Sequence, residues 1–128
     1  MLVWCWLALA GALGAVARQV LATLIPAAAG GAMQVGVLVV NVLGCTLFGF
    51  VVRLGGVGGW IGPQTQAVLL VGFLGAFTTF STYVADLVEM ARAGRYGLVA
   101  LHVAGHNVLG VLGLLLGAWF AGVVGPRA

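Results

Sequence analysis

Long apolar runs, separated by short stretches containing glycine and proline, dominate the hydropathy pattern of this chain. The runs predict helices over about residues 2–25, 35–53, 66–91 and 96–124. A helix needs roughly 20 apolar residues to cross the hydrocarbon core of a bilayer, and each run is near or above that length. The pattern therefore predicts an all-α integral membrane protein with four transmembrane helices, forming a single domain over residues 1–128.

Composition supports a membrane location. Hydrophobic residues make up 63% of the chain and charged residues only 5%, whereas soluble domains carry about 25% charged residues. The basic residues are all arginines, scattered near the ends of apolar runs, so no basic cluster indicates nucleic acid. Large aromatics also fall near the predicted helix ends, where the bilayer meets water: Trp4, Trp6, Trp60, Tyr96 and Trp119.

Glycine and arginine placement bears on assembly. Glycines recur inside the predicted spans, and Gly113 and Gly117 have the small-xxx-small spacing that lets membrane helices approach closely. Arginines are divided almost evenly between the two predicted sides, so the positive-inside rule favours neither orientation. A chain of this kind can insert both ways, and two opposed copies would form an antiparallel, dual-topology homodimer.

Polar residues within a span are costly and mark candidate functional positions. Arg18, in the first run, either extends toward the membrane surface or lines an aqueous vestibule that attracts an anion. Asn41, near the middle of the second, either bonds to another helix or presents N–H donors to a pore.

The third run contains the most informative stretch, residues 72–83, with two glycines and four hydroxyl residues. Hydroxyl side chains compete for backbone hydrogen bonds, so we expect this helix to be broken at mid-membrane depth. Such a break exposes carbonyl oxygens, which are suitable ligands for a hard monovalent cation. Phe77, Phe80 and Tyr83 recur at intervals of three residues. They form either ordinary core or a row of positive ring edges beside a small anion.

Other polar residues give weaker signals. His102, His106 and Asn107 favour hydrogen bonding inside the bundle over a metal pair, because no cysteine or carboxylate joins them in sequence. Asp86 and Glu89 are interpreted as solvated or paired charges near the end of a helix. The sequence contains no nucleophile–base pair, phosphate loop or carboxylate dyad, so it does not predict an enzyme.

Three motifs resemble the Fluc (CrcB) family of fluoride channels: Gly11–Arg18 in the first helix, Asn41–Gly44 in the second and Gly72–Tyr83 in the third. The resemblance implies passive export of fluoride through two pores of an antiparallel homodimer in the bacterial inner membrane, which protects the cell from fluoride. It also implies a central sodium ion at the dimer axis.

By the same resemblance, the carbonyls of Gly75 and Thr78 would hold the sodium ion. The pore would be lined by the side chains that match the family's pore residues: Asn41, Phe80, Tyr83, Ser81 and Thr82, with Arg18 in the vestibule. The chain departs from the family pattern at Tyr83, where phenylalanine is usual, and at His106 and Asn107, where small residues are usual.

The main alternative is a small dual-topology multidrug transporter, which also has four spans. Those proteins depend on a carboxylate embedded in the first helix, and the first helix of this chain contains no acidic residue. A second alternative is an assembly subunit without transport activity, held together by glycine packing alone.

Overall fold

The computed structural model describes residues 2–25, 34–56 and 59–125, and most of these residues are helical, with no strand among them. Four segments are long and apolar enough to cross a membrane: Leu2–Leu24, Val35–Gly55, Pro63–Arg92 and Tyr96–Val124. The prediction of four apolar helices is therefore confirmed for the described part of the chain. Large hydrophobic side chains such as Leu13 and Leu115 point outward, as they should when the surrounding solvent is lipid.

Three of the spans are continuous helices: α1 (Leu2–Leu24), α2 (Val35–Gly55) and α6 (Tyr96–Val124). The third span begins at Pro63, three residues before the start that the pattern predicts, because proline is well suited to the first turn of a helix. The third and fourth spans are joined by a tight turn in which Gly94 adopts a φ of 70°. The stretch between the first two apolar runs begins at Pro26, where the sequence indicates a short turn, and it lies outside the described residues.

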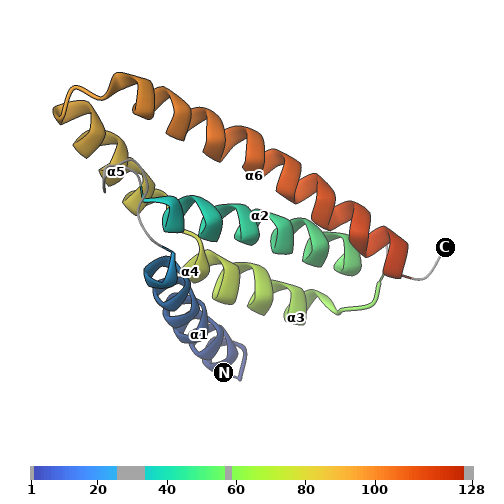
Figure 1. Cartoon of the computed structure of the whole chain (residues 1–128). Helices are drawn as coiled ribbons and strands as arrows, with labels where there is room; N and C mark the ends of the chain where they lie inside the picture. Colours follow the sequence, from blue (N-terminus) through green and yellow to red (C-terminus); the bar gives the residue numbers. More distant parts are fainter. Residues whose placement is uncertain (1, 26–33, 57–58, 126–128) are drawn as a thin grey trace.

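The third span is not one helix. It consists of α3 (Pro63–Ala67), a π-helical segment η1 (Val68–Leu74), the short α4 (Gly75–Phe77) and α5 (Phe80–Arg92). Between α4 and α5 the backbone is extended at Thr78 and Thr79, with ψ angles of 156° and 113°. After this break α5 runs beside the first half of α6, whereas α3 and α4 lie below α2 (Figure 1). The helix is thus interrupted within the cluster of hydroxyl residues.

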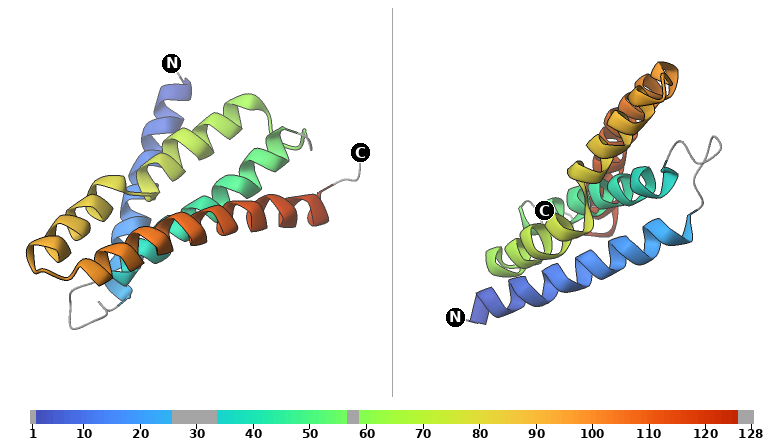
Figure 2. Two further views of the ribbon diagram at one scale, coloured as in Figure 1. Left: turned by 90° about the horizontal axis from the view of Figure 1, so that it is seen from above. Right: turned by 90° about the vertical axis from the view of Figure 1, so that its left-hand side faces the viewer.

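The helices pack through glycines, as the predicted small-residue spacing requires. A Cβ atom on Gly117 of α6 would collide with the Thr46 carbonyl of α2, and one on Gly49 would collide with the Leu114 carbonyl. In the same way α1 crosses the third span with Gly14 against the Phe73 carbonyl, a crossing visible in the left view of Figure 2. Backbone-to-backbone contact therefore fixes the positions of the spans around the break.

We expect Gly117→Ala to destabilise the protein, because the new methyl group must push α6 away from the Thr46 carbonyl. Overpacking of this kind costs about 1–3 kcal/mol, which should appear as a lower midpoint in thermal unfolding of the detergent-solubilised protein. Gly105→Ala is a matched control on the same helix, since its Cβ would meet only the Leu38 side chain at 3.8 Å. Equal midpoints for the two variants would contradict the packing described here.

Candidate functional site

A hollow of about 560 Å³ lies between α2, the broken third span and α6, and it is open on one side in the single chain. Its wall contains apolar residues together with polar groups that are unusual in a membrane protein. The polar residues lining it are Asn41, Thr78, Thr79, Tyr83, His106 and Asn107. The break in the third span therefore forms part of a groove whose mainly apolar wall carries several polar groups.

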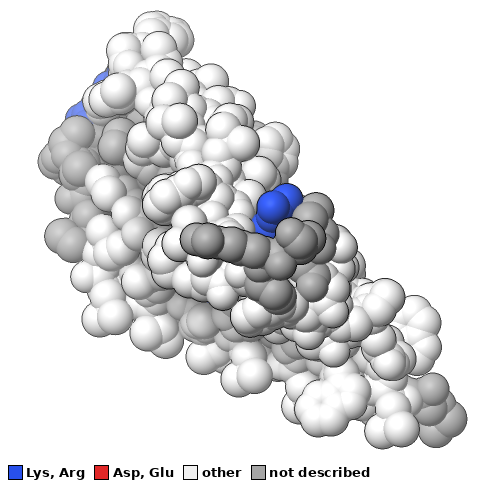
Figure 3. All heavy atoms as spheres, turned by 90° about the vertical axis from the view of Figure 1, so that its right-hand side faces the viewer, with Lys and Arg blue, Asp and Glu red and all other residues white. Residues whose placement is uncertain are grey.

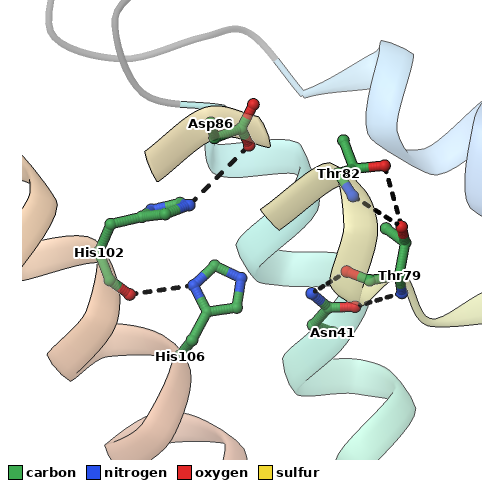
Figure 4. A network of polar contacts seen from close by, with 6 residues as sticks. All are labelled: Asn41, Thr79, Thr82, Asp86, His102 and His106. Atoms are coloured by element: carbon green, nitrogen blue, oxygen red, sulfur yellow. Dashed lines mark hydrogen bonds and ion pairs between the residues drawn. The ribbon is translucent and has the colours of Figure 1, made fainter. Parts of the chain in front are cut away.

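The side chain of Asn41 holds the break in position. Its Nδ2 donates to the Thr79 carbonyl at 3.1 Å, and its Oδ1 accepts from the Thr79 N–H at 2.8 Å (Figure 4). The two hydrogen bonds fix the orientation of the amide. If the amide were reversed, its NH₂ group would face the Thr79 N–H and its oxygen would face the Thr79 carbonyl. Of the two interpretations of Asn41, the structure shows the hydrogen bond to another span. The amide has a second N–H donor, and Asn41 also lines the groove.

This pairing leaves two carbonyls without their helical donors. In a regular helix the carbonyl of Gly75 accepts from the N–H of Thr79, four residues on, but that N–H is donated to Asn41. Similarly, the expected donor to the Thr78 carbonyl is the N–H of Thr82, which instead caps α5 by donating to Thr79 Oγ1 at 3.2 Å. These carbonyls belong to the residues predicted to bind sodium, and both residues line the groove.

The aromatic stripe divides between core and groove. Phe77 is buried and stacks on Phe73, with ring centroids 5.6 Å apart. Phe80 is 77% exposed in the single chain and lies 5.8 Å from Tyr83, centroid to centroid. Tyr83 is buried against the His106 ring at 4.2 Å. Phe80 and Tyr83 both line the groove, whereas Phe77 is ordinary packing.

Three of the predicted site residues lie apart from the groove lining. Ser81 and Thr82 are beside Thr79 at the start of α5, with hydroxyl oxygens 3.4 and 2.9 Å from Thr79 Oγ1. Arg18 is partly buried on α1, and its Nε has no hydrogen-bond partner within the described structure. A single chain thus brings Asn41, Gly75, Thr78, Phe80 and Tyr83 together, but not Ser81, Thr82 or Arg18.

Sequence reasoning missed the role of Thr79, which is buried and both pairs with Asn41 and caps α5. It also took Asp86 for a solvated or paired charge. Asp86 is only 8% exposed, so solvation is the wrong alternative, and its Oδ2 lies 3.9 Å from Nε2 of the buried His102 (Figure 4). One feature of the sequence could have indicated a buried partner for Asp86: His102 and His106 are four residues apart and therefore lie on one face of their helix.

Charge is scarce over the rest of the molecule. The face drawn in Figure 3 shows a few basic side chains, no acidic ones, and otherwise uncharged surface. Four apolar spans with polar groups gathered at a break define a multi-pass membrane protein.

Comparison with known proteins identifies the family. Residues 5–118 match the model of the family described as CrcB-like protein, Camphor Resistance (CrcB), and the chain belongs to this family. A protein named fluoride-specific ion channel FluC from Nitratidesulfovibrio vulgaris is 44% identical over 87% of this chain and 90% of its own length. The Deinococcus radiodurans protein of that name is 41% identical over 90% and 94%, respectively. The family is one of ion channels and not of enzymes.

We expect Asn41→Leu to destabilise the break, because the N–H and carbonyl of Thr79 would lose their partners away from water. Each unsatisfied buried group costs about 1–3 kcal/mol. The variant should show a lower thermal midpoint and faster amide hydrogen exchange at Thr79. Asn107→Leu is the matched control, because Asn107 donates to the Val103 carbonyl of its own helix at 2.8 Å. Slow exchange at Thr79 in Asn41→Leu would argue against the pairing.

Proposed function

We propose that this chain is a fluoride-selective channel that acts as an antiparallel homodimer in the bacterial inner membrane. The channel lets fluoride leave the cytoplasm passively and so lowers its toxicity. The observation that carries the proposal is similarity over nearly the whole chain to proteins named fluoride-specific ion channels. The groove at the break of the third span supplies the chemistry that this function requires.

A second copy of the chain is the natural cover for the groove. Asn41, Thr78 and His106 line an opening that would otherwise face lipid, and polar groups at that depth are tolerated only when buried in protein or lining a water-filled cavity. Phe80, 77% exposed beside them, is an apolar contact for the partner or a wall of the pore. In a dimer each copy closes the groove of the other, with the break at mid-membrane depth.

The donors suited to fluoride are distributed around this groove. Fluoride is small and strongly hydrated, so a pore must replace its water with other donors. Asn41 has an amide N–H beyond the one given to Thr79, and the Phe80 and Tyr83 ring edges are positive. Ser81 and Thr82 hydroxyls at the start of α5 continue the polar side, and Arg18 attracts the anion into the vestibule.

A sodium ion at the dimer axis fits the residues present. The carbonyls of Gly75 and Thr78 have lost their helical donors to Asn41 and Thr79, and carbonyl oxygens suit a hard monovalent cation. Two such carbonyls from each copy would surround one ion on the axis. The ion would offset negative charge deep in the membrane.

Purified protein in liposomes should release fluoride much faster than chloride, because the proposed donors compensate the dehydration of a small anion. A fluoride electrode and a chloride electrode measure the two rates on the same preparation, with protein-free liposomes as the blank. Equal rates, or export of organic cations in place of fluoride, would remove the proposal. The second outcome would favour the multidrug-transporter alternative.

In the same flux assay, Phe80→Ile tests whether the Phe80 side chain lines the pore or only packs against its neighbours. The substitution keeps bulk and apolarity, which costs less than about 1.5 kcal/mol when a residue is only packed, but it removes the ring edge. Fluoride flux should fall sharply while the dimer purifies as before. Tyr83→Phe, which restores the usual family residue, should retain flux. Normal flux in Phe80→Ile would leave the ring without a pore role.

Dual topology predicts that a C-terminal tag is labelled only partly from either side of the membrane. Adding several lysines to one end should force a single orientation, and flux should then require coexpression with a copy biased the opposite way. Complete labelling of the unmodified protein from one side would exclude the antiparallel dimer while leaving fluoride selectivity to be judged by the flux assay.

A further inference from the structure

Tyr83, Asp86, His102 and His106 form a polar cluster between α5 and α6 that the proposed pore does not fully use. The His106 ring lies 4.2 Å from the Tyr83 ring and 4.4 Å from the His102 ring, centroid to centroid. His102 is 1% exposed. These contacts hold His106 in one orientation at the wall of the groove.

The hydrogen bond of His106 determines where its proton sits. Nδ1 lies 3.0 Å from the His102 carbonyl oxygen, and a carbonyl only accepts, so Nδ1 carries the hydrogen. In the neutral ring Nε2 is then a bare acceptor. Nε2 is buried and has no hydrogen-bond partner in the described structure, and it lies across the ring from the His102 carbonyl (Figure 4). A buried acceptor without a partner requires a donor or a proton.

We propose that His106 Nε2 is a fluoride-binding position that acts only after protonation, so that the channel binds a proton and a fluoride ion there together. The idea rests on the proposed function and adds a proton-linked binding site to it. A proton from water adds to the Nε2 lone pair, and the new N–H donates to fluoride; release reverses both steps. The neutral ring presents a lone pair to the anion and repels it.

The titratable groups around the two histidines include one buried carboxyl group, that of Asp86. On α5, Tyr83 packs on the His106 ring, and Asp86 lies against His102, with its Oδ2 3.9 Å from His102 Nε2. Glu89 follows three residues after Asp86 and is exposed. His102 faces His106 from the same helix, and Cys45 of α2 lines the same groove. A carboxylate at Asp86 provides the histidine pair with a counter-charge. The arginines of α2 and α5 lie near the helix ends, at Arg53 and Arg92, and Arg95 directly precedes α6.

The flux test compares fluoride release between about pH 5.5 and about pH 8, which brackets the ordinary histidine pKa of about 6.5. Flux at sub-saturating fluoride should rise at least about fivefold as pH falls, a typical size for coupled binding. His106→Gln keeps a permanent N–H donor at a similar reach, so its flux should persist without that pH dependence. His106→Leu should be slow at every pH. Protein-free vesicles correct for neutral hydrogen fluoride crossing the lipid.

Asp86→Asn identifies the titrating group. If His106 carries the proton, this variant keeps a pH dependence, which His106→Gln lacks. Loss of the dependence in Asp86→Asn together with its survival in His106→Gln would overturn the assignment. So would wild-type flux that does not change with pH.

A second readout does not depend on flux. Binding is reciprocal, so fluoride must raise the proton affinity of His106 by the factor with which protonation raises fluoride affinity. The ¹⁵N imidazole signals of the detergent-solubilised dimer, assigned with His106→Gln, should show a higher titration midpoint in fluoride than in chloride. An unchanged midpoint overturns this inference. Absence of fluoride flux at any pH would instead overturn the proposed function.

Discussion

The bidentate pairing of Asn41 with Thr79 is the interaction on which the site depends. A break in a span that lay within hydrocarbon would leave backbone groups that cannot bond to water, and each would cost several kcal/mol. Asn41 compensates both polar groups of Thr79 with one side chain, and the Thr79 hydroxyl then caps the first turn of α5. The carbonyls of Gly75 and Thr78 lose their helical donors as a consequence. The same contact therefore stabilises the break and creates the carbonyl oxygens that we assign to sodium.

Asn41 can reach Thr79 only because the helices approach closely. Gly44, one turn beyond Asn41, lies against the Thr78 methyl group, where a Cβ would collide. Gly14 does the same for α1 against the Phe73 carbonyl, and Gly117 for α6 against α2. Hydrophobic burial gives little preference between lipid and a neighbouring helix. Close backbone packing at these glycines is what positions the break, and with it Phe80 at the open side of the groove.

The sequence was sufficient for the parts of this architecture that follow from local composition. Apolar run length predicted the four spans, and the hydroxyl residues around Thr78 predicted the interruption. It could not show that Asn41 bonds to Thr79, because the partners are 38 residues apart and hydropathy carries no distance information. Nor could it distinguish Phe77 from Phe80. The two belong to the same three-residue spacing, but Phe77 lies in the core and Phe80 lines the groove. Nor could it decide between a solvated and a paired Asp86, because the burial of that side chain and its contact with His102 depend on another helix.

The two sides of the groove then have different electrostatic properties. On the α2 side, Asn41 offers amide hydrogens whatever the pH, and we assign a fixed cation to the carbonyls nearby. On the α6 side, His106 offers a donor only when it is protonated, because its Nδ1 hydrogen is already given to the His102 carbonyl. Tyr83 packs directly on that ring, with the centroids 4.2 Å apart, so the tyrosine and the histidine line the groove together. An anion between the two sides would meet one constant and one proton-dependent partner, and its residence there would follow the availability of protons at the groove.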